Sequence, residues 1–132
     1  MIFVDASFWI GRALPRDSRH ADARSLERIT QGEHLVTSGS VLGETWTILR
    51  RRLPHGTAYA ALDAIRALHG IRIEHIDESL EADAWSWLRV HDERRYSLVD
   101  ATSFALMRKL RIREALAFDG DFAAAGFVEL RP

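Results

Sequence analysis

Short apolar runs alternate with longer helical patterns along nearly the whole chain, and this alternation limits the fold more than any other feature. Parallel strands need long crossover connections, usually helices, so such an order predicts an α/β fold with a parallel sheet covered by helices on both faces. We expect strands at residues 2–5, 34–37, 71–76, 114–118 and, as a short final strand, 128–130.

Helical patterns fill the segments between these runs. Ser38 or Ser40 can cap one helix, which Pro54 stops, and Ser97 can cap another, with Asp100 placed three residues later as in a capping box. We expect helices through Phe8 to Ile10, in the stretch from Asp17 to Ile29, and at 38–52, 57–69, 78–94 and 99–110.

Composition restricts the class of protein. At 132 residues, we expect one domain covering 1–132. The absence of cysteine excludes disulfides, thiolate catalysis and zinc–thiolate sites, and it suits a reducing cytoplasm. No apolar run has the roughly 18 residues that a membrane span needs, and we expect no membrane association and no signal peptide. The net charge of −1 does not by itself predict nucleic-acid binding.

Four acids, far apart in sequence, occupy positions where a carboxylate is unfavourable unless a cation is near. Asp5 and Asp119 each end an apolar run, Asp100 opens a helix, and Glu44 lies within a helical pattern. In open parallel sheets, active sites form at the carboxyl ends of the strands, where we expect Asp5 and Asp119. Because converging carboxylates repel one another, such a cluster usually binds a divalent cation. The pattern therefore predicts a metal-dependent enzyme.

Each of these acids also has a structural interpretation. Asp5 and Asp119 could cap the helices that follow them, and Asp100 could be a first-turn acid favoured by the helix dipole. Glu44 interrupts the apolar stripe that begins with Val41, where an unpaired carboxylate costs several kcal/mol or becomes protonated. A salt bridge to a buried arginine is the alternative to a metal at Glu44.

Three further polar residues lie close in sequence to these acids and are candidate supporting residues: Ser7, Ser103 and Asp121. Asp121 could hold a second ion or an outer-shell water, or it could be a solvated residue at a helix start. Either serine hydroxyl could hydrogen-bond a ligand carboxylate or a water, although bonding to nearby backbone is more common.

Four motifs in order carry a family resemblance: Phe3–Ser7, Thr37-Ser38 with Val41–Thr45, Ser97–Phe104, and Leu116–Phe122 with Gly126-Phe127. With these motifs the chain resembles a PIN-domain ribonuclease, and most closely a VapC-type toxin of a bacterial toxin–antitoxin pair. The resemblance spans nearly the whole chain. One departure is Ala117, where relatives often carry a threonine or serine whose hydroxyl supports the acidic pocket, and its absence is expected to weaken metal binding without removing a principal ligand.

This resemblance implies a Rossmann-like three-layer PIN domain that binds Mg²⁺ or Mn²⁺ and cuts single-stranded RNA or RNA loops endonucleolytically. An all-oxygen donor set matches these ions far better than zinc. By resemblance, Asp5 and Asp100 bind the metal directly, while Glu44 and Asp119 complete the shell and orient the attacking water. The resemblance also implies a cognate VapB-like antitoxin and a homodimer.

Two other classes of protein compete with this interpretation. The triplet from Asp119 to Asp121 superficially matches the Asp-x-Asp of haloacid-dehalogenase-like phosphotransferases, but these need a later lysine, and Lys109 is the only lysine here. A catalytically inactive PIN-like module that binds RNA or protein is the stronger alternative. The intact set of acids argues against it, since a module without activity need not keep converging carboxylates.

Overall fold

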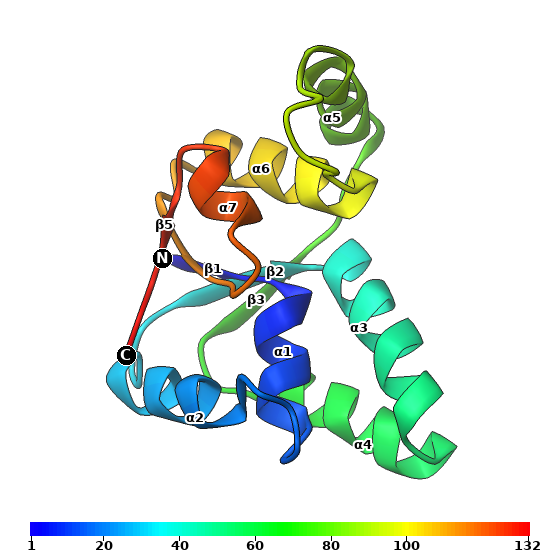
Figure 1. The fold of residues 1–132 in the computed structure, drawn as a ribbon, viewed down its shortest axis with the longest axis vertical. Helices are drawn as coiled ribbons and strands as arrows, with labels where there is room; N and C mark the ends of the chain where they lie inside the picture. Colours follow the sequence, from blue (N-terminus) through cyan, green and yellow to red (C-terminus); the bar gives the residue numbers. More distant parts are fainter.

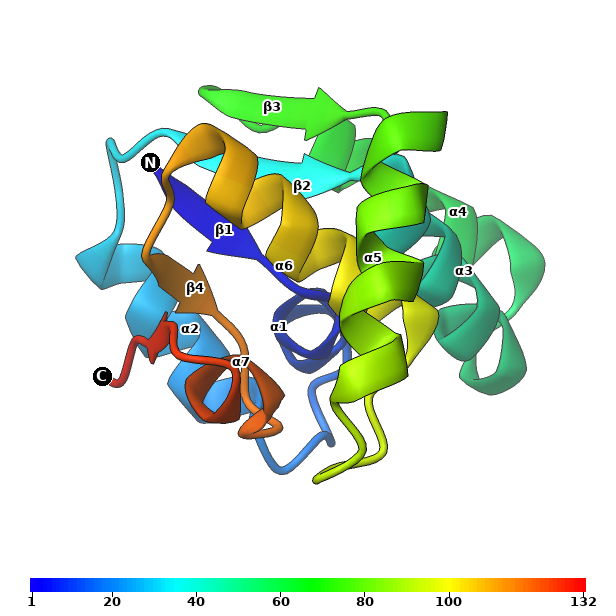
Figure 2. The same cartoon turned by 90° about the horizontal axis from the view of Figure 1, so that it is seen from above.

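Five short strands form one parallel sheet, in the order β3-β2-β1-β4-β5, in this computed structural model of residues 1–132 (Figures 1 and 2). All four strand pairings are parallel, and β1 lies in the centre with Phe3 opposite Val36 and Ala115. The prediction of an α/β fold with a central parallel sheet is therefore confirmed. The strands are β1 (Ile2–Val4), β2 (Leu35–Ser38), β3 (Ile71–Glu74), β4 (Glu114–Leu116) and β5 (Val128–Glu129).

Helices cover both faces of the sheet and form the two outer layers of a three-layer fold. In Figure 1, α5, α6 and α7 lie above the sheet, and α1, α2 and α4 lie below it, while α3 runs from the end of β2 towards α4. None of these helices is long and apolar enough to cross a membrane. Their bounds are α1 (Ala6–Ala13), α2 (His20–Ile29), α3 (Gly39–Arg52), α4 (His55–Arg66), α5 (Glu78–Val90), α6 (Leu98–Leu110) and α7 (Asp121–Ala124).

An aromatic cluster attaches the upper helices to the sheet. Phe104 of α6 is fully buried, and its ring lies 5.2 Å from that of Trp87 on α5 and 4.9 Å from that of Phe122 on α7. Phe122 in turn stacks on Phe3 of β1 at 5.9 Å. Because aromatic pairs at these distances combine a large buried area with a preferred geometry, they hold α5, α6 and α7 in place over the central strand.

The α5 helix is shorter than the pattern predicted. It ends at Val90 instead of near Arg94, because His91 takes an extended conformation and its ring stacks on Trp87 at 4.0 Å. The chain then runs as a loop from 91 to 97 before Ser97 caps α6. This loop places Arg94 beside the end of β4, where it contacts the candidate site. Smaller differences occur in α4, which covers 55–66 instead of 57–69, and in the strands. Four strands end one or two residues earlier than expected, whereas β2 covers 35–38 instead of 34–37.

Candidate active site

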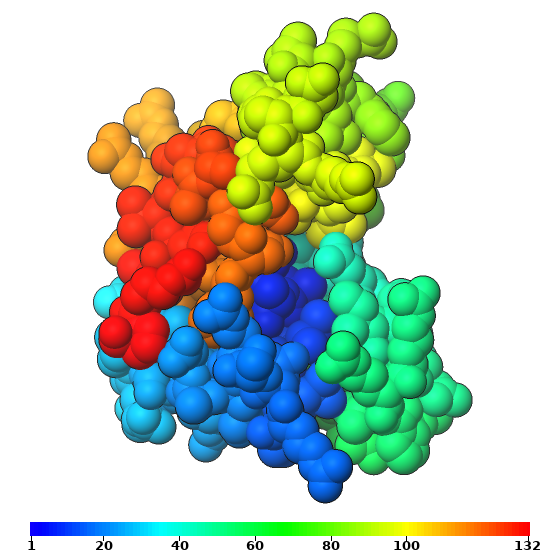
Figure 3. Space-filling model, viewed as in Figure 1, coloured from blue at the N-terminus to red at the C-terminus, as the bar shows by residue number.

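The carboxyl ends of the central strands open into a hollow on the surface. In Figure 3 the dark blue start of the chain forms its floor, between the orange segment that follows β4 and the cyan-green α3. Asp5 follows β1, Asp119 follows β4, Asp100 lies in the first turn of α6, and Glu44 lies on α3. The topology therefore brings four distant segments of the chain to one edge of the sheet.

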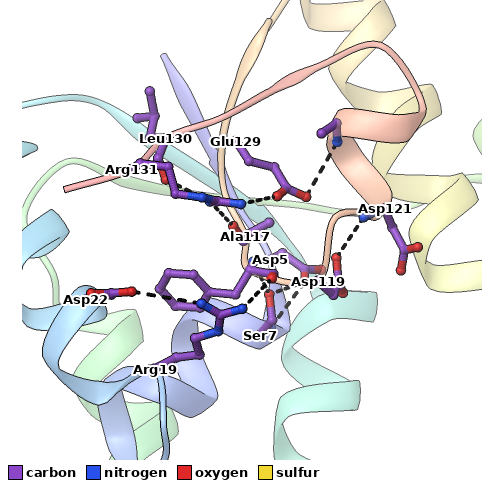
Figure 4. Close-up of polar contacts among 12 residues, drawn as sticks. Asp5, Ser7, Arg19, Asp22, Ala117, Asp119, Asp121, Glu129, Leu130 and Arg131 are labelled. Carbon is purple, nitrogen blue, oxygen red and sulfur yellow. Dashed lines mark hydrogen bonds and ion pairs between the residues drawn. The ribbon is translucent and has the colours of Figure 1, made fainter.

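Asp5 is the most enclosed of these acids. It is 3% exposed and is the N-cap of α1, where its Oδ2 accepts hydrogen bonds from the backbone N–H of Ser7 at 3.1 Å and from the Ser7 hydroxyl at 2.8 Å. The same hydroxyl oxygen accepts the N–H of Phe118 at 3.1 Å, which links α1 to the segment after β4 (Figure 4). Ser7 thus orients Asp5, as a supporting residue would.

Asp100 forms a capping box with Ser97. The Ser97 N–H donates to Asp100 Oδ2 at 3.0 Å, and the Asp100 N–H donates to the Ser97 hydroxyl at 3.0 Å. The side chain is nearly buried, yet its second oxygen makes no hydrogen bond and is free for a ligand. Ser103 is fully buried, but its hydroxyl donates to the Val99 carbonyl at 2.9 Å. The hydroxyl thus bonds to the backbone, which was the more common of the two predicted uses.

The tightest group of carboxylates consists of Asp100, Asp119 and Asp121, each of which offers one oxygen within 4.8 Å of the others. Asp119 Oδ1 accepts the Asp121 N–H at 3.2 Å across a turn in which Gly120 has a φ of +82°, a value that favours glycine. Asp121 was expected only as a supporting residue, whereas Asp5 and Asp100 were the expected direct ligands. Here the closest oxygens include Asp121 and not Asp5.

The five acids nevertheless affect one another through their charges, which contribute to the raised pKa values of four of them. Burial, followed by the charge of Asp119, raises the pKa of Asp5 from its ordinary value of 3.8 to about 7. Partial burial is the largest cause that raises the pKa of Asp119 to about 6, and the charges of Asp121 and Asp100 add to it. Burial also raises the pKa of Asp100, with Asp121 contributing. In each case burial is the largest cause and the charges of neighbouring acids add to it, as expected for carboxylates gathered at one place.

Glu44 belongs to this group and has no cationic partner. Burial raises its pKa, and the charges of Asp100 and Asp119 add to the shift. The salt bridge to a buried arginine, which was the alternative for Glu44, does not occur, because no ion pair of the structure includes this residue. Val41 and Thr45 on the same helix are buried, while Glu44 is half-buried and close enough to Asp100 and Asp119 for their charges to affect its pKa.

The one cation that contacts the tight group is Arg94, which sequence patterns did not identify. Its Nε donates to Asp121 Oδ1 at 2.8 Å, and its Nη2 donates to the backbone carbonyl of Asp119 at 3.2 Å. The chain between Arg94 and Asp121 spans 27 positions. No local signal predicts this pair, because the pattern placed Arg94 at the end of a helix.

A large cavity of the molecule lies elsewhere. It has a volume of about 700 Å³ and is lined by residues of α1 and α2 and by His34 and Gly70, which precede β2 and β3. None of the five acids lines it. The candidate site is instead the hollow of Figure 3, and it is defined by its group of carboxylates.

The fold and the acidic edge together define a PIN domain: the PIN-domain family model matches residues 2–128, and the chain belongs to this family. The predicted resemblance is thereby confirmed. The chain is 55% identical over 132 residues to the 23S rRNA-specific endonuclease VapC20 of Mycobacterium tuberculosis, with 100% of this chain and 99% of that protein covered.

Solved structures agree with this assignment. The crystal structure of M. tuberculosis VapC20, described as a sarcin-ricin loop cleaving toxin, matches with a TM-score of 0.92 at 53% identity over 100% of both chains. FitAcB from Neisseria gonorrhoeae matches with a TM-score of 0.71 over 98% of this chain and 96% of that one. At 16% identity, this second likeness concerns the fold alone.

The raised pKa values predict that the metal-free protein becomes less stable as the pH rises. The folded state holds protons on Asp5 and Asp119 up to about pH 7 and about pH 6, whereas the unfolded chain releases them near 3.8. Because the folded state binds more protons between these values, its free energy of unfolding falls as the pH increases from about 4 to about 7. Urea unfolding in EDTA across this range measures the slope. An Asp5→Asn variant should show a shallower slope, and equal slopes for both proteins would contradict this account.

Removing the charge of Glu44 should stabilise the metal-free protein. We expect Glu44→Gln to raise the free energy of unfolding by roughly 0.5–1 kcal/mol near neutral pH, the size of a solvent-screened charge interaction. Thermal melting in EDTA tests this, with Glu33→Gln as the matched control, since Glu33 is exposed in a loop. A Glu44→Gln variant that melts below the wild type without metal would show that Glu44 makes a stabilising ion pair instead.

Proposed function

We propose that this protein is a metal-dependent endoribonuclease that cleaves the sarcin–ricin loop of 23S rRNA and acts as the toxin of a toxin–antitoxin pair. The predicted endonuclease class is confirmed by the family and by the named relative that is 55% identical over the whole chain. The observation that carries the proposed mechanism is the convergence of five carboxylates at one edge of the sheet with only one cation in contact.

The donor set fits a hard divalent cation, for which we propose Mg²⁺ or Mn²⁺. It contains only carboxylate oxygens, and a separation of 4.8 Å or less suits ligands that share one ion at about 2.1 Å each. Asp100 and Asp119 would hold the ion, with Asp5, Glu44 and Asp121 completing its surroundings directly or through water. When bound, such an ion makes water more acidic and balances the negative charge of the scissile phosphate.

The exposure of each acid suggests its role in hydrolysis. The reaction adds the oxygen of water to phosphorus and breaks a phosphorus–oxygen ester bond, so a proton must leave the water and another must reach the departing oxygen. Glu44 is half-buried and Asp119 is exposed, so their carboxylates can reach a water beside bound RNA and orient it. Asp5 is enclosed, and Ser7 occupies one of its oxygens, which suits a group that holds position instead.

The identity of the substrate rests on the relatives. A chain that matches a 23S rRNA-specific endonuclease over its full length at this level of identity is expected to keep the same target class. Ribosomal RNA as substrate implies that the protein acts in the cytoplasm. The toxin class further implies a VapB-like antitoxin that covers the site, and we propose a homodimer for the same reason. A catalytically inactive module has no observation in its favour, because all the acids are present and close together.

Substitution of the central acids should abolish cleavage without unfolding the protein. We expect Asp5→Asn and Asp100→Asn each to reduce the cleavage rate of a sarcin–ricin loop hairpin about 100-fold or more. Without a properly held metal, the negative charge on the phosphate in the transition state loses several kcal/mol of stabilisation. Gel assays with Mg²⁺ or Mn²⁺ measure the rate. Asp63→Asn on the exposed face of α4 is the control and should cut normally.

Two outcomes would contradict this function. Equal cleavage in excess EDTA would exclude the metal mechanism. Equal cleavage of a hairpin with a scrambled loop would leave the nuclease class intact but overturn the proposed target.

A further inference from the structure

Three arginines from different parts of the chain hold three consecutive backbone carbonyls of the segment that carries Asp119. Figure 4 shows two of them, Arg19 and Arg131, on either side of this segment. The three donors and their acceptors are Arg131 Nη1 to the carbonyl of Ala117 at 3.1 Å, Arg19 Nη2 to that of Phe118 at 3.4 Å, and Arg94 Nη2 to that of Asp119 at 3.2 Å.

This segment needs such partners because it has left the sheet. The last hydrogen bond of the pairing between β1 and β4 joins the Asp5 N–H to the Leu116 carbonyl at 3.0 Å. No backbone N–H donates to the carbonyls of residues 117, 118 or 119. Ala117 and Phe118 are buried, where an unpaired carbonyl is costly. The arginines therefore replace the neighbouring strand for these three residues.

Each of these arginines also lies near a carboxylate of opposite charge. Arg131 pairs with Glu129 at 2.6 Å, Arg19 lies 3.9 Å from Asp22, and Arg94 pairs with Asp121 at 2.8 Å. Arg19 additionally packs over the ring of Phe118 at 5.5 Å from its centroid. Guanidinium groups suit this role because their planar fork can serve a carbonyl and a carboxylate at once.

Arg94 is the member that touches the candidate metal site directly. Its fork joins the carbonyl of Asp119 to Oδ1 of Asp121, so it fixes both ends of the turn at Gly120. A Cβ at position 120 would lie 3.4 Å from Arg94 Nη2, which is an ordinary contact, so the φ of +82° and not the arginine favours glycine here. The second oxygen of Asp121 makes no hydrogen bond and is free to act together with Asp100 and Asp119.

We propose that Arg19, Arg94 and Arg131 form an arginine clamp that positions Asp119 and Asp121 for metal binding, with Arg94 as its decisive member. This inference rests on the proposed metal-dependent function. It assigns the arginines a positioning role, since none of them need touch the substrate or the ion. It also indicates how the acidic turn stays ordered although position 117 has no side-chain hydroxyl.

Positioning and simple electrostatics predict opposite results when Arg94 is removed. A positive charge beside the acids repels a second cation, so its loss should strengthen metal binding if charge alone matters. If Arg94 instead holds the two carboxylates in place, its loss should weaken metal binding, as the loss of an outer-shell partner typically does. The sign of the change therefore separates the two explanations.

The experiment measures Mn²⁺ binding to the purified, RNA-free protein by calorimetry. We expect Arg94→Ala to raise the Mn²⁺ dissociation constant about 10- to 100-fold, which means weaker binding. Arg94→Lys keeps the charge but replaces the planar fork, whose two nitrogens serve the two acceptors, with a single ammonium nitrogen, and it should also bind Mn²⁺ more weakly than the wild type. The control is Arg95→Ala, which removes the same charge one residue away, where Arg95 is exposed and makes no side-chain hydrogen bond or ion pair. It should bind Mn²⁺ as well as the wild type or slightly better.

Two results would overturn the proposal in distinguishable ways. If Arg94→Ala binds Mn²⁺ as tightly as Arg95→Ala, the clamp is wrong while the metal site stands. If the wild-type protein binds no Mn²⁺, the metal-dependent function fails and the clamp with it. Circular dichroism of each variant in EDTA tests whether the compared proteins are folded. If Arg94→Ala is unfolded, Arg94→Lys decides the question: weaker Mn²⁺ binding than in the wild type supports the clamp, and equal binding overturns it.

Discussion

Repulsion among carboxylates is the interaction on which the arrangement of this protein depends. Five acids meet at one edge of a parallel sheet, and each raised pKa in the group has burial as its largest cause and a neighbouring acid among the others. Such an arrangement costs folding free energy unless a cation is bound or protons are held. The rest of the site can be understood as the means by which the fold keeps these groups together.

Local structure and function use the same atoms at two of these acids. Asp5 caps α1 and Asp100 completes the capping box of α6, so the structural explanations considered for both residues are correct. They do not compete with a ligand role, because each cap occupies one carboxylate oxygen and leaves the other without a hydrogen bond. Helix starts placed at strand ends thus bring acids to one point and also orient them.

The sequence predicted the parts of this structure that follow from local patterns. Strand and helix order, the placement of Asp5 and Asp119 at strand ends, and the capping box were all accessible because periodicity and caps are local. The loop at 91–97 was not, because it depends on the stacking of His91 on Trp87 and on a pair between Arg94 and Asp121. The prominence of Asp121 over Asp5 in the tight group was also inaccessible, since it depends on the distances that the tertiary fold sets.

A crystal structure grown with Mn²⁺ and measured at an anomalous wavelength tests the central claim most directly. The account predicts an anomalous peak within about 2.5 Å of carboxylate oxygens from several of the five acids, including Asp100 and Asp119. A map from Mn²⁺-saturated crystals with no peak among these carboxylates, or with the acids paired to protein cations in its place, would contradict it.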